Sequence, residues 1–222
     1  MWEKFVFLNN RQTIENSQYL YGMERMVIMY QLHISLNEIK PLIWRRMMVD
    51  SGTSLFYLHN YIQLVFGWKN YHLYRFDKNG VEFSDPRLYE GEPVIDVKVI
   101  PLDTVLKEPG DSLIYEYDFG DGWSHTLRLE EVKTCELRAS KPVCLEGANA
   151  TPPEDVGGLC GFEEFREVIS NPSHTQYKEF RRWAGHAYDP SFFSLKKANT
   201  MLGTRKRYIQ DYDFHINYPG IR

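Results

Sequence analysis

Residues 118–125 read Asp-Phe-Gly-Asp-Gly-Trp-Ser-His and place two carboxylates and an imidazole close together. Such groups form a common ligand set for divalent metals and also suit general acid–base catalysis. Asp118, Asp121 and His125 are therefore the candidate catalytic residues. The same residues are typical of a tight turn, because Asp side chains bond their own backbone and glycine adopts positive φ. A structural turn is the favoured interpretation, and a metal-assisted site is the alternative.

Two further histidines could complete a metal site with His125. His59 falls on the apolar face of a predicted helix, and His72 lies in a predicted strand. Such histidines are usually hydrogen-bonded core residues, which is the favoured interpretation for both. If His59, His72 and His125 converged, a shared metal would explain them better, because buried imidazoles without partners are costly. The sequence requires no cofactor, and a divalent metal is the one candidate.

Other residues that could do chemistry lie in the loop rich in Pro and Gly. Residues 152–158 could hold Glu154 and Asp155 over a cleft, although an ordered connection is the favoured interpretation. Cys135, Cys144 and Cys160 lack Cys-x-x-Cys spacing, which argues against a zinc site built from them.

The charge of the chain is unevenly distributed. The net charge is −4, yet residues 178–207 carry eight basic and two acidic side chains. With interleaved aromatic residues, such a segment could bind nucleic acid. A solvated helix face is the favoured alternative. The candidate binding residues are Arg181, Arg182, Lys196, Lys197, Arg205, Lys206 and Arg207.

The hydrophobic pattern predicts the elements that must position these residues. Alternation predicts strands, apolar spacing of three and four predicts helices, and Gly67 ends the clearest helix. The expected strands cover 30–36, 43–49, 71–77, 81–84, 113–119 and 123–132, with a weaker one at 208–217. The expected helices cover 55–66, 162–170, 173–184 and 195–202, and 141–161 is expected to be a loop.

This order predicts an α+β fold, with a largely antiparallel sheet, one central helix and a helical C-terminal third. We expect an N-terminal extension at 1–25, one domain at 26–205 and a C-terminal tail at 206–222.

Composition excludes several classes of protein. The 222 residues are 43% hydrophobic and 15% aromatic, which excludes a largely disordered chain. No apolar run is long enough to cross a bilayer, and the first residues do not form a signal peptide. Three cysteines in a chain of this size favour a reducing compartment. We therefore expect a cytosolic protein without a membrane partner.

Four strings are more specific than these patterns. They are Pro-Leu-Ile-Trp-Arg-Arg at 41–46, Leu-His-Asn-Tyr-Ile-Gln at 58–63 leading to Tyr-His-Leu at 71–73, the segment 115–125, and Pro-Pro-Glu-Asp-Val-Gly-Gly at 152–158. Their order and spacing resemble the plasmid pRiA4b ORF-3-like family over about residues 28–202. The resemblance implies a compact α+β protein without an assigned activity, in a family found on chromosomes, plasmids and transposable elements.

The chain departs from that family pattern at three positions. Many members have a second histidine where Tyr74 stands, and cysteines where Thr151 and Val156 stand. Only Cys144 remains of that cysteine cluster, so the resemblance implies no cysteine-bound metal in this chain.

Three hypotheses about function follow. The first is a non-enzymatic binding or accessory protein, associated with mobile elements or with nucleic acid through the basic C-terminal third. The second is a metal-assisted hydrolase that uses Asp118, Asp121 and His125 with His59 or His72. In the third, the aromatic and turn motifs only define the fold. The first and third rank above the second, and the sequence leaves open whether the protein is an enzyme.

Overall fold

The computed structural model describes residues 26–89, 93–136 and 141–217, with the side chains of 214–217 left out. The described strands form one eight-stranded sheet in the order β5-β4-β3-β6-β7-β1-β2-β8. All neighbouring pairs are antiparallel except β4 and β5. The predicted α+β class with a largely antiparallel sheet is confirmed.

The bounds of the strands are Met26–Leu36 (β1), Trp44–Asp50 (β2), Tyr74–Lys78 (β3), Val81–Ser84 (β4), Ile95–Asp96 (β5), Ser112–Tyr117 (β6), Trp123–Glu136 (β7) and Val143–Ala148 (β8). The bounds of the helices are Leu55–Phe66 (α2), Pro86–Leu88 (η2, a 3-10 turn), Leu102–Val105 (α3), Gly158–Ser170 (α4), Tyr177–Trp183 (α5), Leu195–Gly203 (α6) and Arg205–Asn217 (α7).

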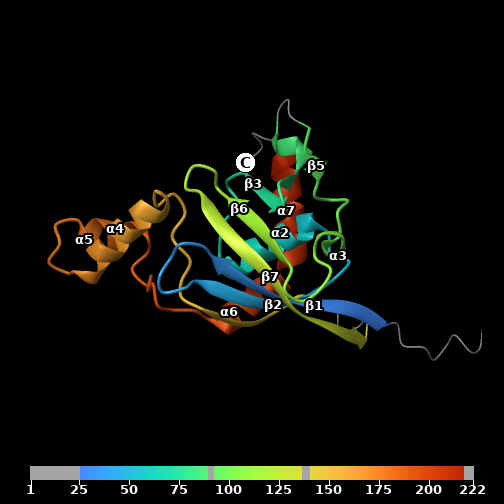
Figure 1. Ribbon diagram of the computed structural model, residues 1–222. Coiled ribbons are helices and arrows are strands. Elements are labelled where there is room, and N and C mark those ends of the chain that lie inside the picture. Colours follow the sequence, from blue (N-terminus) through green and yellow to red (C-terminus); the bar gives the residue numbers. More distant parts are fainter. Residues whose placement is uncertain (1–25, 90–92, 137–140, 218–222) are drawn as a thin grey trace, which may run out of the picture.

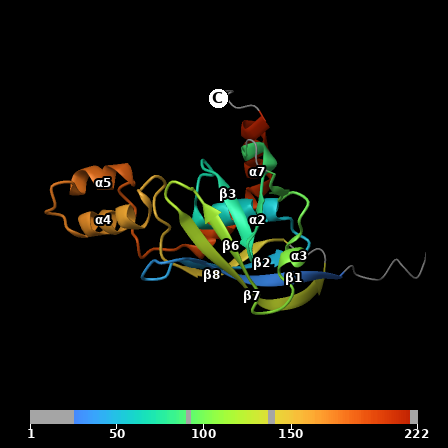
Figure 2. The ribbon, with the colours of Figure 1, turned by 45° about the horizontal axis from the view of Figure 1, so that its top comes forward.

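One face of the sheet forms the core. In β1 the even-numbered residues from Tyr30 to Leu36 are buried, and the odd-numbered residues between them are half-buried. Helix α2 covers the buried face, and α6 and α7 pack against α2 (Figures 1 and 2). Gly67 ends α2 in the left-handed conformation with φ 85°, where glycine carries no Cβ penalty.

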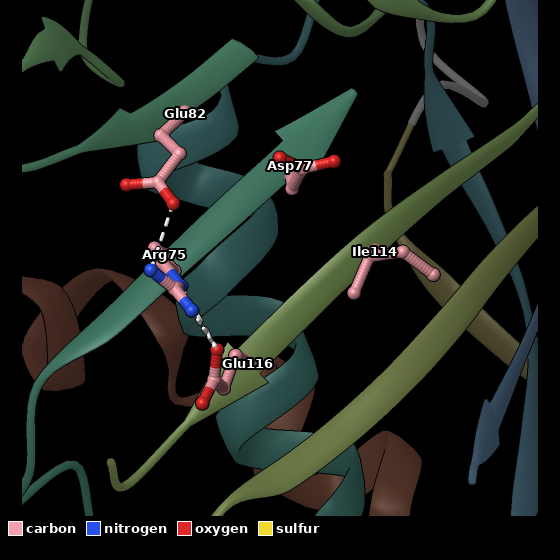
Figure 3. A pocket seen from close by; sticks show the side chains of 5 residues that line it. All are labelled: Arg75, Asp77, Glu82, Ile114 and Glu116. Atoms are coloured by element: carbon pink, nitrogen blue, oxygen red, sulfur yellow. Dashed lines mark hydrogen bonds and ion pairs between the residues drawn. The ribbon is translucent and has the colours of Figure 1, made fainter. Parts of the chain in front are cut away.

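The opposite face of the sheet is open and carries charged pairs. Arg75 on β3 reaches both Glu82 on β4 and Glu116 on β6, with nitrogen–oxygen distances of 2.7 and 2.8 Å (Figure 3). These residues line a polar hollow of about 220 Å³. Because the arginine is already paired with two carboxylates, this hollow presents no unneutralised cation.

Helices α4 and α5 form a hairpin that stands away from the sheet (Figures 1 and 2). Aromatic rings hold the hairpin together and join it to the sheet. Phe165 packs against Phe180 and Tyr188 with centroid distances of 6.0 and 5.2 Å, and Phe162 meets Trp123 of β7 at 6.4 Å. The sheet and the hairpin therefore share one aromatic core.

Two expectations about local structure were wrong. Residues 143–148, expected in a loop, form edge strand β8, where Asn199 of α6 bonds both the backbone N–H and the carbonyl of Cys144. Residues 208–217, expected to be a strand, belong to α7. Tyr208, Ile209 and Tyr212 lie on one helical face that packs toward α2. The expected boundary between domain and tail at 205 and 206 falls at the start of this helix.

Candidate metal centre

The turn between β6 and β7 positions Asp118. The residue has a left-handed backbone with φ 59°, and its side-chain Oδ1 accepts hydrogen bonds from the N–H groups of Gly120 and Asp121. Its carbonyl accepts from the N–H of Gly122. These are the bonds expected of a structural turn. These hydrogen bonds use Oδ1, and the second carboxylate oxygen, Oδ2, takes no part in them.

Strand pairing brings His72 to that second oxygen. β3 pairs with β6 so that Tyr74 lies opposite Tyr117, and the N–H of Asp118 donates to the carbonyl of Leu73. His72 therefore lies beside the turn, with its Nε2 3.5 Å from Oδ2 of Asp118. The register of two antiparallel strands decides this proximity.

The loop 152–158 contributes Glu154. The side chain is 6% exposed, and its Oε2 lies 3.8 Å from Nε2 of His72. Its Oε1 accepts hydrogen bonds from the Lys69 N–H and the Tyr117 hydroxyl. Burial raises the pKa of Glu154 above its usual range, although these hydrogen bonds oppose the shift. Asp155 follows it, 67% exposed, with Oδ1 3.1 Å from His72 Nε2.

Asp121 holds the loop against the turn. Its Oδ2 accepts a hydrogen bond of 3.2 Å from the N–H of Gly157. At Gly158, which has φ +67°, a Cβ would lie 2.7 Å from the carbonyl oxygen of Asp121. Only glycine allows the loop to approach so closely. Asp121 therefore positions the loop that carries Glu154.

His72, Asp118 and Glu154 are three groups that could hold a metal ion. Their ligand atoms all lie within 4.8 Å of one another, and no other such group of three occurs within 26–89, 93–136 and 141–213. Within the same residues, no Lys or Arg forms an ion pair with Asp118 or Glu154. His72 Nε2 is buried and makes no hydrogen bond. Buried carboxylates without a Lys or Arg partner, beside an imidazole nitrogen that faces only carboxylate oxygens, are what a cation site requires.

The structure leaves His59 in the core. Its ring stacks on Tyr74 with a centroid distance of 3.4 Å, and its nitrogens bond the Tyr115 hydroxyl and Asn70 Oδ1, both at 2.8 Å. Burial lowers its pKa to about 3. A neutral ring with both nitrogens engaged is a core histidine.

His125 is also a core residue and does not join the ligand set. Its Nδ1 lies 3.0 Å from the carbonyl oxygen of Trp123, and its ring meets Phe66 edge to face. Its Nε2 is buried without a hydrogen-bond partner, but unlike His72 it contacts no carboxylate among the described residues. Burial lowers its pKa to about 4. His59, His72 and His125 are therefore not brought together, because alternation in β7 and the apolar face of α2 direct two of them into the core.

The candidate nucleic-acid residues are divided between two places. Arg181 and Arg182 lie on α5 in the projecting hairpin, whereas the others lie on α6 and α7 beside the sheet (Figure 1). Arg207 pairs with Asp211 at 3.7 Å. The other members on α6 and α7 are Lys196, Lys197, Arg205 and Lys206.

Two residues matter more in the structure than the sequence indicates. Glu154 is expected in a loop whose favoured interpretation is an ordered connection, and Arg45 is expected only as part of a strand. The two prolines before Glu154 were the signal of a rigid loop. Arg45 is 2% exposed and occupies an inward position of β2, in line with Ile43, Met47 and Val49. An arginine at an inward position of a strand was a signal in the sequence.

The fold and the site define an α+β protein with a mixed carboxylate–histidine centre at one end of its sheet. The chain belongs to the plasmid pRiA4b ORF-3-like family, whose model matches residues 28–197. No helix of the described residues is long and apolar enough to cross a membrane.

Two relatives show the extent of the similarity. The chain is 34% identical over 171 residues to "Uncharacterized protein y4hQ" of Sinorhizobium fredii (strain NBRC 101917 / NGR234), covering 76% of this chain and 88% of that protein. It is also similar to the crystal structure of a protein of unknown function, MM3350, from Methanosarcina mazei Go1. The TM-score is 0.68 with 33% identity, covering 77% of this chain and 97% of the other.

Proposed function

We propose that the protein binds a divalent metal ion through His72, Asp118 and Glu154, and uses it in a hydrolytic reaction. One observation carries this proposal. Two nearly buried carboxylates and an imidazole nitrogen present ligand atoms within 4.8 Å of one another, without a Lys or Arg partner among the described residues.

The donor set defines the metals that fit. One imidazole nitrogen and two carboxylate oxygens suit zinc, manganese or iron rather than a soft ion. Three protein ligands leave coordination positions for water and substrate, and a metal bound there would supply an activated water or polarise a substrate oxygen. This set retains Asp118 from the hydrolase hypothesis and assigns Asp121 a supporting role.

The surrounding residues support the ligands. The Tyr117 hydroxyl and the Lys69 N–H hold Glu154, while Gly120 and Asp121 hold Asp118 through their N–H groups. Such partners orient metal ligands and maintain their charge. Asp155 is exposed at the rim of the site, where it can accept a proton from a bound water or serve as a further ligand.

The first test is metal content, measured by elemental mass spectrometry on tag-free protein purified without chelator. We expect close to one equivalent of a transition metal in the wild type, and loss of most of it in His72→Ala and in Glu154→Gln. The matched control is Glu116→Gln, which removes a carboxylate two residues before Asp118 on the open face of the sheet. Metal-free wild type that fails to bind added zinc or manganese in calorimetry would overturn the proposal.

The hydrolytic part needs a separate test. Metal-loaded protein should cleave at least one member of a panel of phosphoesters and amides. Activity should fall at least tenfold in Asp118→Asn and stay unchanged in Glu116→Gln. Metal binding without any turnover would retain the centre and reject the enzyme.

A further inference from the structure

A concave site lies on the projecting hairpin, away from the proposed metal centre. Helix α4 begins beside Asp121, and its C-terminal end, from Arg166 on, lines this site about 12 Å or more further along the helix. There, α4, α5 and the segment 186–190 enclose a cavity of about 340 Å³. Its polar lining includes Arg166, Arg181, His186, Tyr188 and Asp189.

Backbone carbonyls hold the two arginines of this cavity in place. Arg166 Nη1 donates to the carbonyl of Lys40 at 2.6 Å, and Arg181 Nη1 donates to the carbonyl of Tyr188. The Nε of Arg181 is 3.4 Å from the Tyr177 hydroxyl. Each guanidinium thus has a fixed orientation and retains N–H groups that make no hydrogen bond within the described residues.

Neither Arg166 nor Arg181 forms an ion pair with an Asp or Glu within 26–89, 93–136 and 141–213, although Asp189 interacts electrostatically with Arg181 at longer range. Asp189 lines the cavity, but its Oδ1 accepts hydrogen bonds from the N–H and the hydroxyl of Ser191. Glu163 and Glu167 line the neighbouring hollow on the other side of Arg166. The cavity therefore has two oriented cations and one carboxylate that is already hydrogen-bonded.

We propose that this cavity binds a phosphate group carried by a nucleotide, with Arg166 and Arg181 contacting its oxygens and His186 adding a third donor. Oriented guanidinium groups match the oxygens of a phosphate in paired hydrogen bonds. The cavity, at about 340 Å³, leaves room beside a phosphate for the rest of a nucleotide. Lys178 and Arg182 are exposed on the same helix and extend the positive surface beyond the cavity.

The phosphate can come from a free nucleotide or from a nucleic-acid strand, and one assay separates them. Fluorescence anisotropy would follow labelled single-stranded and duplex DNA of about 20 nucleotides at low salt. Adenosine monophosphate and inorganic phosphate would serve as competitors, with direct calorimetric titration of the nucleotide. A strand that binds much more tightly than the nucleotide identifies nucleic acid as the source, and similar affinities identify the nucleotide.

The variants distinguish the cavity from general charge. The double variant Arg166→Gln and Arg181→Gln is matched by Lys196→Gln and Lys197→Gln, which removes the same charge from exposed positions on α6. We expect at least a tenfold loss of affinity in the first and less than twofold in the second. For DNA, log affinity decreases with log salt, and the magnitude of this negative slope should be smaller by about two in the first variant only.

A conservative variant guards against loss of the fold. Arg166→Lys keeps the charge and the long side chain but cannot make paired hydrogen bonds, so we expect about a fivefold loss with an unchanged melting temperature. Equal losses in the two double variants would overturn the proposal, as would wild type that binds neither DNA nor nucleotide.

Discussion

Two sites with buried charged side chains differ in how many of their polar atoms have hydrogen-bond or ion-pair partners within the protein. At the first, the guanidinium of Arg45 lies between β2, β8 and the end of α2, 2% exposed. All five of its N–H groups donate to oxygens, and the rings of Phe66 and Phe193 lie 4.9 and 4.2 Å from its central carbon. The acceptors are the carbonyls of Val65, Trp44, Ala148 and Asn149 and the hydroxyl of Thr151.

The proposed metal centre is the opposite case. Asp118 and Glu154 lack a Lys or Arg partner among the described residues, and the imidazole Nε2 of His72 faces only carboxylate oxygens. The bonds of Arg45 are complete within the protein, whereas the buried carboxylates of Asp118 and Glu154 have no Lys or Arg partner and can bind a cation. The comparison teaches that a buried charge with complete bonds stabilises the fold, and that buried carboxylates without a Lys or Arg partner are the candidates for ligand binding.

The two sites are also connected along the chain. Arg45 binds Ala148, Asn149 and Thr151, and the Thr151 hydroxyl donates to the carbonyl of Phe66. The prolines at 152 and 153 follow directly and lead to Glu154. The satisfied site thus anchors the loop that supplies a ligand to the unsatisfied one.

The largest expected effect is at Arg45. Arg45→Met would leave several buried carbonyls without donors, so we expect a loss of about 3 to 5 kcal/mol in the free energy of unfolding. Urea unfolding measures it. Arg46→Met on the open face, which breaks partly exposed ion pairs with Glu130 and Glu146, should cost about 1 kcal/mol or less. Equal losses in the two variants would show that the fully bonded, buried guanidinium of Arg45 stabilises the fold no more than the partly exposed Arg46.

Acid should destabilise the protein through His59 and His125. Their folded pKa values are lowered to about 3 and about 4, whereas the unfolded rings titrate near 6.5. The unfolded chain binds more protons below pH 6.5, so their contribution to stability is present above 6.5 and is lost as pH falls toward 4. At pH 5.5 we expect a loss of about 1.4 kcal/mol for each histidine relative to pH 7.5.

Urea unfolding at these two pH values tests the histidines. His59→Gln should reduce the pH-dependent loss by about half. A protein whose stability is unchanged at pH 5.5 would show that the two rings take up protons in the folded state as readily as in the unfolded chain.

Gly158→Ala probes the closure of the loop over the turn. The new Cβ would approach the Asp121 carbonyl, and the residue would keep an unfavourable positive φ, so we expect a loss of about 2 kcal/mol together with weaker metal binding. Gly185→Ala is the matched control, since Gly185 also has positive φ but nothing within 4 Å of an added Cβ. If both variants bind zinc equally in calorimetry, loop closure does not position Glu154.

The smallest effect has the opposite sign. Glu154→Gln in metal-free protein removes a buried charge that crowds Asp118 and Asp155, while an amide oxygen can still accept from Tyr117 and Lys69. We expect a gain of about 1 kcal/mol in the free energy of unfolding at pH 7, measured in urea with chelator present. The control Glu116→Gln, which breaks a pair with Arg75, should show no gain. A loss in Glu154→Gln would mean that this carboxylate is structurally satisfied, as Arg45 is.

Local chemistry explains what could be predicted. β1 alternates cleanly because one face is buried, α2 has regular apolar spacing and a glycine stop, and the turn after Tyr117 has the Asp and Gly residues that such turns need. β8 escaped prediction because it is an edge strand with one buried side chain, Cys144, and so shows no alternation. α7 was mistaken because Tyr208, Ile209 and Tyr212 fit helical spacing within a segment that also alternates weakly.

The sequence by itself determined which residue types are present and the local geometry around each, including the turn that fixes one oxygen of Asp118. Only the tertiary structure decided that His72, Asp118 and Glu154 meet, while His59 and His125 do not. The physical reason is that ligands so far apart in the chain are joined by strand register and by a loop anchored at Asp121 and Arg45. A one-residue change in the β3–β6 register would move His72, which lies just before β3, away from Asp118 and disrupt the site.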